Sequence, residues 1–309
     1  RPSGTALVTM KVLPDRAHGH RLHGGGAPLT PYLFLLPYLV VFVLFRFGPV
    51  VGGFLTSFTS WSIVGAPRFV GLANYEALAR DPLFYTSIRN TFYFLVLTAP
   101  ALIVLGFAFA LLLNRPLAGR GVARVLIFAP YAMMSAVVGI LWNWILDSNF
   151  GLLNYYLAQV HLGPIPWLSS EAAAMPAIAL TTVWWTVGYN MVIFLAGLQD
   201  IPPQLEESAR IDGAGPWQVL WNVIVPLLRP TTFVVVMLTI INTFQVFDQV
   251  YVMTGGGPGT ATLTLVQYLF FQAFQTFKLG YGSAIAYVTF AFLLVLSWLQ
   301  QRLLPSEAS

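Results

Sequence analysis

Four polar side chains interrupt one apolar run of this 309-residue chain and are placed where they could bind a small polar molecule. Asn242, Gln245 and Gln249 recur at i, i+3 and i+7, which predicts one shared helix face, and Asp248 lies beside them. Polar groups inside a membrane are costly and tend to face a cavity. We therefore expect this face to line a path for a solute.

A second polar set lies in the middle of another apolar run. Its members are Thr181, Thr182, Trp184, Trp185, Tyr189 and Asn190. Amides and hydroxyls bind sugars by hydrogen bonds, and aromatic rings stack on them. The two faces together predict a path for a sugar-like solute. The alternative is that these amides and hydroxyls bond between helices while the aromatic rings lie at membrane interfaces.

The sequence contains no clear pattern of residues for catalysis, metal binding or ATP binding. No paired carboxylates, and no nucleophile beside a base, are recognisable. Cysteine is absent, and the cluster of His18, His20 and His23 lies in a Gly-rich segment that is typical of a disordered tail. A phosphate-binding loop needs a lysine after glycine, and neither Lys11 nor Lys278 follows one. We predict no catalytic residue, no metal and no cofactor bound by this chain.

Composition places the chain in a membrane. Apolar residues make up 57% and charged residues 8%, whereas a soluble domain carries about 25% charged residues. The net charge of +4 comes from cations scattered between apolar runs, so no nucleic-acid partner is expected. The predicted fold class is an all-α integral membrane protein in contact with lipid.

Six helical spans are predicted, since a span needs roughly 20 apolar residues. They cover residues 31–54, 89–113, 125–146, 173–198, 227–250 and 279–301. Residues 1–29 and 303–309 are expected to form tails around a six-span domain at 30–302. Residues 249–277 contain the glycine-rich run 255–259, and we expect an external loop there followed by a short interfacial helix.

Basic residues set the orientation. Ten lie in one set of loops and tails and four in the other, so the ten-residue side is predicted to be cytoplasmic, together with both termini. No cleavable signal peptide is recognised, and residues 1–9 could precede a native start at Met10.

The loop at residues 200–226 is the most informative stretch. Prolines 202 and 203 open a helix predicted over 204–211, glycines 213 and 215 break it, and Pro216 opens a second helix. In that second helix Trp217, Leu220, Trp221 and Ile224 recur on one apolar face. Such short helices are marginal alone, which suggests a partner that covers them.

This loop resembles the EAA motif of permease subunits in binding-protein-dependent ABC importers. Glu207-Ser208-Ala209, then Gly213, then Val223-Ile224-Val225-Pro226 follow the family spacing, with Ser208, Val223 and Val225 as conservative departures. The resemblance implies the type I importer permease architecture, with a cytoplasmic coupling helix that enters a cleft on an ATPase. It assigns ATPase coupling to Glu206, Glu207, Ala209, Asp212, Gly213, Trp217 and Pro226.

Loop sequences elsewhere are similar to the carbohydrate-uptake branch of that family. They lie at residues 71–75, 90–91, 150–154, 166–169 and 251–258. The resemblance implies ATP-driven import of a sugar, oligosaccharide or glycerol-phosphate-like solute by alternating access. It also implies a second homologous permease, two ATP-binding cassette subunits that bind ATP and Mg, and an extracytoplasmic solute-binding protein, in a bacterial or archaeal cytoplasmic membrane. An ion-coupled secondary transporter and a polytopic membrane enzyme remain the alternatives.

Overall fold

The computed structural model describes residues 30–62 and 65–303, and these are helical apart from loops and two isolated β-bridges. The all-α fold class is thereby confirmed. The chain forms two compact units, one ending at Val51 and the other beginning at Gly52. The histidine-bearing segment and the last residues of the chain lie outside the described residues.

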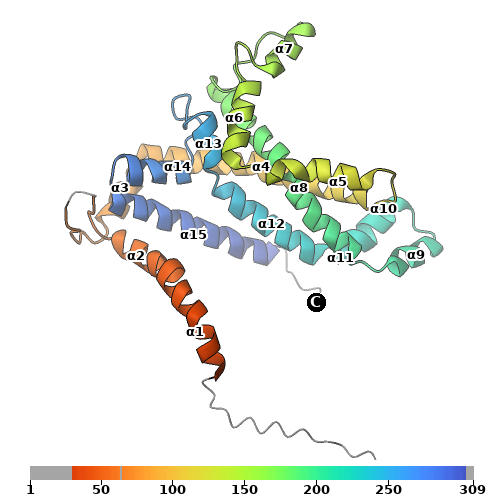
Figure 1. The fold of residues 1–309 in the computed structure, drawn as a ribbon, viewed down its shortest axis with the longest axis horizontal. Coiled ribbons are helices and arrows are strands. Elements are labelled where there is room, and N and C mark those ends of the chain that lie inside the picture. The colour runs from red at the N-terminus through yellow and green to blue at the C-terminus, as the bar shows by residue number, and fades with distance from the viewer. Residues whose placement is uncertain (1–29, 63–64, 304–309) are drawn as a thin grey trace, which may run out of the picture. The chain divides into compact units, whose positions relative to one another are not determined.

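The first helices of the chain together form an apolar segment that is long enough to cross a membrane. Figure 1 labels them α1 and α2. They are α1 (Thr30–Phe42), the π-helical turn η1 (Val43–Phe47) and the start of α2 (Gly48–Thr56). The segment Tyr32–Thr56 has 25 residues and overlaps the run predicted at 31–54. Arg46, the one charged residue of this segment, lies in η1.

Four further helices of the second unit are long and apolar enough to span a membrane. They are α4 (Pro82–Asn114), α8 (Glu171–Gln199), α12 (Arg229–Phe244) with its continuation α13 (Asp248–Met253), and α15 (Leu279–Leu303). They overlap the predicted runs, although α4 begins at Pro82 instead of residue 89. Pro82 occupies the first turn, and Asp81 caps it by accepting a hydrogen bond from the Leu83 amide at 2.9 Å.

The run predicted as one span at 125–146 is instead a bent pair. Here α5 (Arg120–Phe128) and the 3₁₀ turn η2 (Ala129–Ala132) meet α6 (Ser135–Ile145) at 99°. Pro130 has no amide donor for a continuing helix, and Met133 and Met134 take extended backbone angles. The described residues therefore hold five span-length helices, or six if the bent pair crosses as one.

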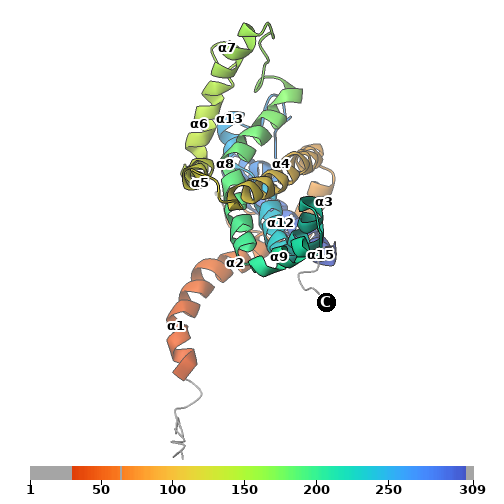
Figure 2. The same ribbon diagram turned by 90° about the vertical axis from the view of Figure 1, so that its right-hand side faces the viewer.

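The remaining helices are short. They are α3 (Ala73–Ala79), α7 (Leu152–Gln159), α9 (Pro203–Ile211), α10 (Pro216–Val219), η3 (Leu220–Ile224), α11 (Val225–Leu227), α14 (Leu265–Phe270) and η4 (Phe271–Gln275). Both views show α7 projecting beyond the helices α4, α8, α12 and α15 (Figures 1 and 2).

Close packing of α8 on its neighbours depends on glycine. A Cβ at Gly188 would lie 2.3 Å from the carbonyl oxygen of Ile127 in α5. A Cβ at Gly106 of α4 would lie 2.8 Å from the Cβ of Asn190 in α8. Side chains at these positions would push the helices apart. The three apolar clusters of the second unit all include residues of α4, and two of them include residues of α8.

The short helix α14, expected at the membrane interface, has one face buried in the protein. Tyr268 and Tyr281 both donate hydrogen bonds to Asp81 Oδ2, and so tie α14 and α15 to the start of α4. Burial opposes ionisation of this carboxyl, but these bonds and those from the backbone outweigh it and hold the pKa of Asp81 below its ordinary value of 3.8. Burial and the bond to Asp81 raise the pKa of Tyr268 to about 12.

Candidate functional site

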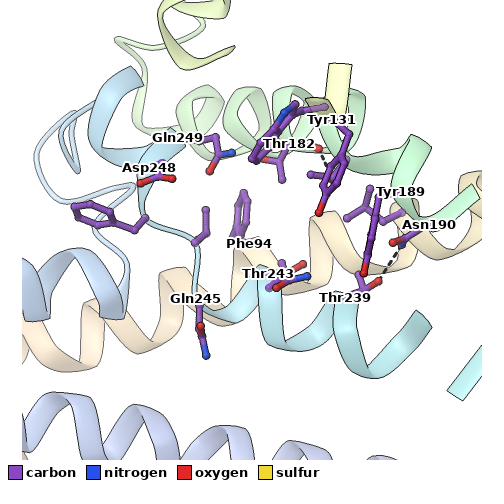
Figure 3. A pocket seen from close by; sticks show the side chains of 16 residues that line it. Phe94, Tyr131, Thr182, Tyr189, Asn190, Thr239, Thr243, Gln245, Asp248 and Gln249 are labelled. Atoms are coloured by element: carbon purple, nitrogen blue, oxygen red, sulfur yellow. Dashed lines mark hydrogen bonds between the residues drawn. The ribbon is translucent and has the colours of Figure 1, made fainter. Parts of the chain in front are cut away.

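A cavity of about 360 Å³ lies where α8 faces two helix breaks (Figure 3). One face of α8 lines it, because its residues recur three to four positions apart. These residues are Thr182, Trp185, Thr186, Tyr189 and Asn190. Four members of the polar set predicted in this run, Thr182, Trp185, Tyr189 and Asn190, therefore line the cavity on one face of α8.

Trp184, which was predicted on the solute path, does not line this cavity. It is two residues from Thr182, so the helix turns its side chain to another side. Its ring packs edge-on against Trp142 at 5.5 Å between centroids. The adjacent Trp185 does line the cavity and donates its ring N–H to the Met133 carbonyl oxygen at 3.3 Å.

The second wall comes from an interrupted helix. We expected Asn242, Gln245 and Gln249 to share one helix face, but α12 ends at Phe244 and α13 begins at Asp248. All three still line the cavity, together with Asp248. The reason for the error lies in the break, since a helical spacing rule does not hold across it.

The break at residues 245–247 is stabilised by a distant residue. The backbone carbonyl of Val246, freed from the helix, accepts a hydrogen bond from the buried hydroxyl of Thr264 at 3.1 Å. Buried backbone groups need such partners in a membrane protein. Figure 3 shows Gln245 pointing away from Asp248 and Gln249, which places its amide at the edge of the site.

Tyr131 completes the aromatic part of the lining and was not predicted. It lies in η2, in the bent pair, and stacks on Tyr189 with ring centroids 4.8 Å apart and an interplanar angle of 22°. Trp185 lies 6.1 Å from the same ring. The signal available in the sequence was Pro130, which marks a break in an otherwise apolar run.

The polar groups of the cavity differ in whether the protein already satisfies them. Asn190 donates to the Thr239 hydroxyl oxygen at 2.9 Å, and Asp248 Oδ2 accepts from the Ser135 hydroxyl at 2.5 Å. Gln249 is only 4% exposed, yet its amide has no hydrogen-bond partner among the described residues. The cavity thus offers aromatic faces and uncommitted polar groups to a bound molecule.

The loop at 200–226 lies in a different part of the chain and forms two short helices, as predicted. Helix α9 ends in a Schellman motif: the Gly213 amide donates to the Arg210 carbonyl at 3.1 Å and the Ala214 amide to the Ala209 carbonyl at 2.9 Å. Gly213 has a φ of +86°, which suits glycine. Asp212, at the end of α9, is exposed.

Charged residues of α9 remain accessible. Glu206 pairs with Arg210 at 3.2 Å, and Glu207 is exposed. A groove of about 1030 Å³ runs between this loop and the turn after α4, and it is lined by Glu206, Arg210 and residues 114–117 among others.

The predicted apolar face of the second helix is confirmed for three of its four residues, because Trp217, Leu220 and Ile224 line the groove and Trp221 does not. Trp217 and Trp221 are 72% and 59% exposed, while Leu220 and Ile224 are half-buried. Residues 220–224 form a π-helical turn, which changes the spacing at Trp221. Pro226 lies within α11, half-buried, before α12 begins. Two exposed tryptophans are thus left on the surface of this loop.

Comparison with known proteins gives a consistent set of similarities. The family model described as "Binding-protein-dependent transport system inner membrane component" matches residues 102–308. The chain is 36% identical over 264 residues to the trehalose/maltose transport system permease protein MalF of Thermococcus litoralis, covering 85% of this chain and 89% of that relative. It is 35% identical over 284 residues to the sulfoquinovosyl glycerol transport system permease protein SmoG of Agrobacterium fabrum, covering 91% and 92%.

A solved structure shares the fold. It is the crystal structure of a bacterial ABC transporter involved in the import of the acidic polysaccharide alginate, with a TM-score of 0.79 and 20% sequence identity, covering 90% of this chain and 96% of that one.

Proposed function

Because the chain belongs to the family of binding-protein-dependent transport system inner membrane components, we propose that it is one of two homologous permease subunits of an ATP-driven importer for a carbohydrate or related polyol. The observation that carries the solute class is the cavity beside α8, where stacked tyrosines lie among amides and a carboxylate. Sugars present both C–H faces and hydroxyls, which match such a lining. The relatives are named for different carbohydrates, so their names do not select the solute of this chain.

ATP hydrolysis takes place on separate subunits in this proposal. ATP and Mg bind two ATP-binding cassette chains, and this chain contributes no ATPase site. The loop of α9 and α10 docks in a cleft of one such chain, with Glu207 and Asp212 exposed for polar contacts and Trp217 as an apolar anchor. Exposed tryptophans on a charged loop support this role, since aromatic residues dominate protein interfaces.

Alternating access follows from this arrangement. Closure of the ATPase pair moves the docked loop, and α12 transmits the movement because it follows the loop directly through α11. The helix breaks at η2 and at residues 245–247 flank the cavity, and breaks of this kind absorb changes in backbone angle. A solute delivered by the external binding protein then leaves on the opposite side.

The orientation of the chain is part of the proposal. The protein lies in the cytoplasmic membrane of a bacterium or archaeon, with both termini and the 200–226 loop on the cytoplasmic side. The excess of basic residues in that set of loops supports this orientation.

Uptake by the complete importer in proteoliposomes tests the proposal. Trp185→Ala, Asn242→Ala and Asp248→Ala should reduce ATP-dependent sugar uptake while the complex still assembles, because their side chains line the cavity. Trp184→Ala is the matched control, an adjacent tryptophan outside the cavity. Unimpaired uptake in all three variants would exclude this cavity as the solute path, and uptake that needs an ion gradient but no ATP would favour a secondary transporter.

A further inference from the structure

We infer that the cavity beside α8 selects an uncharged glycosyl unit against acidic sugars, with Asp248 excluding anions and the Gln249 amide binding a sugar hydroxyl. This inference rests on the proposed function and goes beyond it, because it fixes the charge of the solute and the residue that recognises it.

Charge is the first argument. Among the described residues that line the cavity, Asp248 is the single side chain with a full charge, and no Arg, Lys or His lines it. Its Oδ2 is held by Ser135, and its Oδ1 accepts no hydrogen bond within the described chain. A solute carboxylate or phosphate near this group would meet repulsion and no compensating cation. A neutral hydroxyl would instead donate to Oδ1 in a charge-assisted hydrogen bond.

The buried amide is the second argument. Two lining amides, Asn190 and Gln249, are each 4% exposed. The first is already paired with Thr239, whereas the second has no partner in the part of the chain that the structure describes. The fully enclosed unpaired side-chain atoms of the described residues do not include the Gln249 amide, so this amide is open to the cavity and can pair with a molecule there. In Figure 3 the Gln249 amide points toward the space around Phe94 and Thr182, where a bound ring would lie.

The lining threonines are poor candidates for binding a sugar hydroxyl, because their hydroxyl hydrogens are already used within α8. Thr182 and Thr186 donate their hydroxyl hydrogens to backbone carbonyls one turn earlier, at 2.9 and 2.6 Å. The stacked Tyr131 and Tyr189 provide faces for the apolar side of a sugar ring. Gln249 and Asp248 therefore contribute directional recognition beside the accessible amide of Asn242, and both suit hydroxyl groups.

The test measures binding to the complete permease–ATPase complex in nanodiscs without the binding protein, which has its own selectivity. The probes are methyl glucoside against methyl glucuronide, and methyl galactoside against methyl galacturonide, with quenching of tryptophan fluorescence as the readout. Two like charges about 6 Å apart in a solvent-open site should weaken binding by about tenfold or more, so at least one neutral glycoside should bind that much more tightly than its acid. Asp248→Asn should reduce the difference in binding affinity between the neutral glycoside and its acid.

Gln249→Leu, which keeps the size of the side chain, should weaken binding of the neutral glycoside by about tenfold. Gln275→Leu is the matched control, because its side chain is exposed and lines no part of this cavity. Glycosides and uronides that bind equally would overturn the charge selection, and equal effects of the two leucine variants would overturn the role of Gln249.

Uptake measurements separate this inference from the proposed function. A complex with its binding protein that imports no carbohydrate at all would overturn the proposed function. A complex that imports carbohydrate but binds none of the neutral probes, or prefers the acids, would overturn this inference alone.

Discussion

Replacing Gly213 by alanine should uncouple ATP hydrolysis from uptake, because the turn that orients the docking loop depends on a left-handed residue. Gly213 has a φ of +86°, and its amide and that of Ala214 close the end of α9. A β-carbon in this conformation meets the neighbouring carbonyl oxygen, which costs about 1–2 kcal/mol. No other atom obstructs the site, since an added Cβ would have nothing within 4 Å.

The magnitude follows from that strain alone. A cost of about 1–2 kcal/mol changes the ratio of the native turn to other conformations by a factor of roughly 5–30. The second helix of the loop begins only three residues later, at Pro216. A different turn at Gly213 would therefore change the direction of this helix and the position of Trp217. We expect ATP hydrolysis to continue while the amount of solute imported per ATP falls several-fold.

Gly215 offers a matched control two residues away. It has a φ of −71° and a ψ of 166°, an extended conformation open to any residue, and a Cβ there would contact only Gln218 Oε1 at an ordinary 3.7 Å. Gly215→Ala should therefore leave coupling intact. Gly213→Asn should fall between the two, since asparagine tolerates the left-handed region better than alanine.

The assay compares sugar uptake and phosphate release in proteoliposomes that contain the complete importer. The reasoning is refuted if Gly213→Ala couples as well as the unchanged protein, or if Gly215→Ala is impaired to the same degree. A loss of both uptake and hydrolysis with intact assembly would point to failed docking and not to uncoupling.

Three further predictions concern stability. Gly188→Ala should destabilise the folded chain by about 1–3 kcal/mol through overpacking of α8 on α5, whereas Gly121→Ala, whose Cβ meets nothing, should not; thermal unfolding in detergent measures both. Thr239→Val should cost about 1–3 kcal/mol by stranding the buried amide of Asn190, and Asn190→Leu should recover part of that loss when the two are combined. The carboxyl of Asp81 has a lowered pKa in the folded state, so its stabilising contribution is complete above pH 3.8 and disappears as the pH falls through the folded value, a step that Asp81→Asn should lack in unfolding temperatures measured against pH.

The 200–226 loop was predictable because its signals are local. Prolines open its helices, Gly213 ends the first of them, and these effects need no distant partner. The departure of Trp221 from the shared apolar face was not predictable from spacing. A π-helical turn at η3 shifts the positions that follow it, and the sequence of that turn holds no glycine or proline to announce it.

The cavity was only partly predictable, because Pro130 signals one of its two helix breaks while the other depends on tertiary structure. Gln249 and Asp248 were found as polar residues in an apolar run, but the break before them contains neither glycine nor proline. It persists because Thr264, 18 residues after Val246, donates a hydrogen bond to the freed carbonyl of Val246. The choice between Trp184 and Trp185 likewise depended on which face of α8 meets the breaks.

Two asparagines in the loop sequences that resemble the carbohydrate-uptake branch stabilise loops outside the cavity. Asn90 donates to the backbone carbonyls of Thr260 and Leu263 at 2.7 and 3.1 Å, and so fixes the glycine-rich loop against α4. Asn154 accepts from the Trp167 ring N–H at 3.0 Å and binds backbone groups on both sides of its own loop. These side chains are committed to the backbone of the protein and line no part of the cavity.

It follows that family membership and cargo are encoded in different residues of this chain. Loop-fixing residues such as Asn90 preserve the shape of the permease and resemble those of its branch, but they line no part of the cavity and so do not select the individual solute. The cavity side chains are individually ordinary and become a site only because two helix breaks bring them to one face of α8. Gln249 shows this directly: in an unbroken helix it would be one more intramembrane amide, and in the folded chain it is buried without a partner where a solute can supply one.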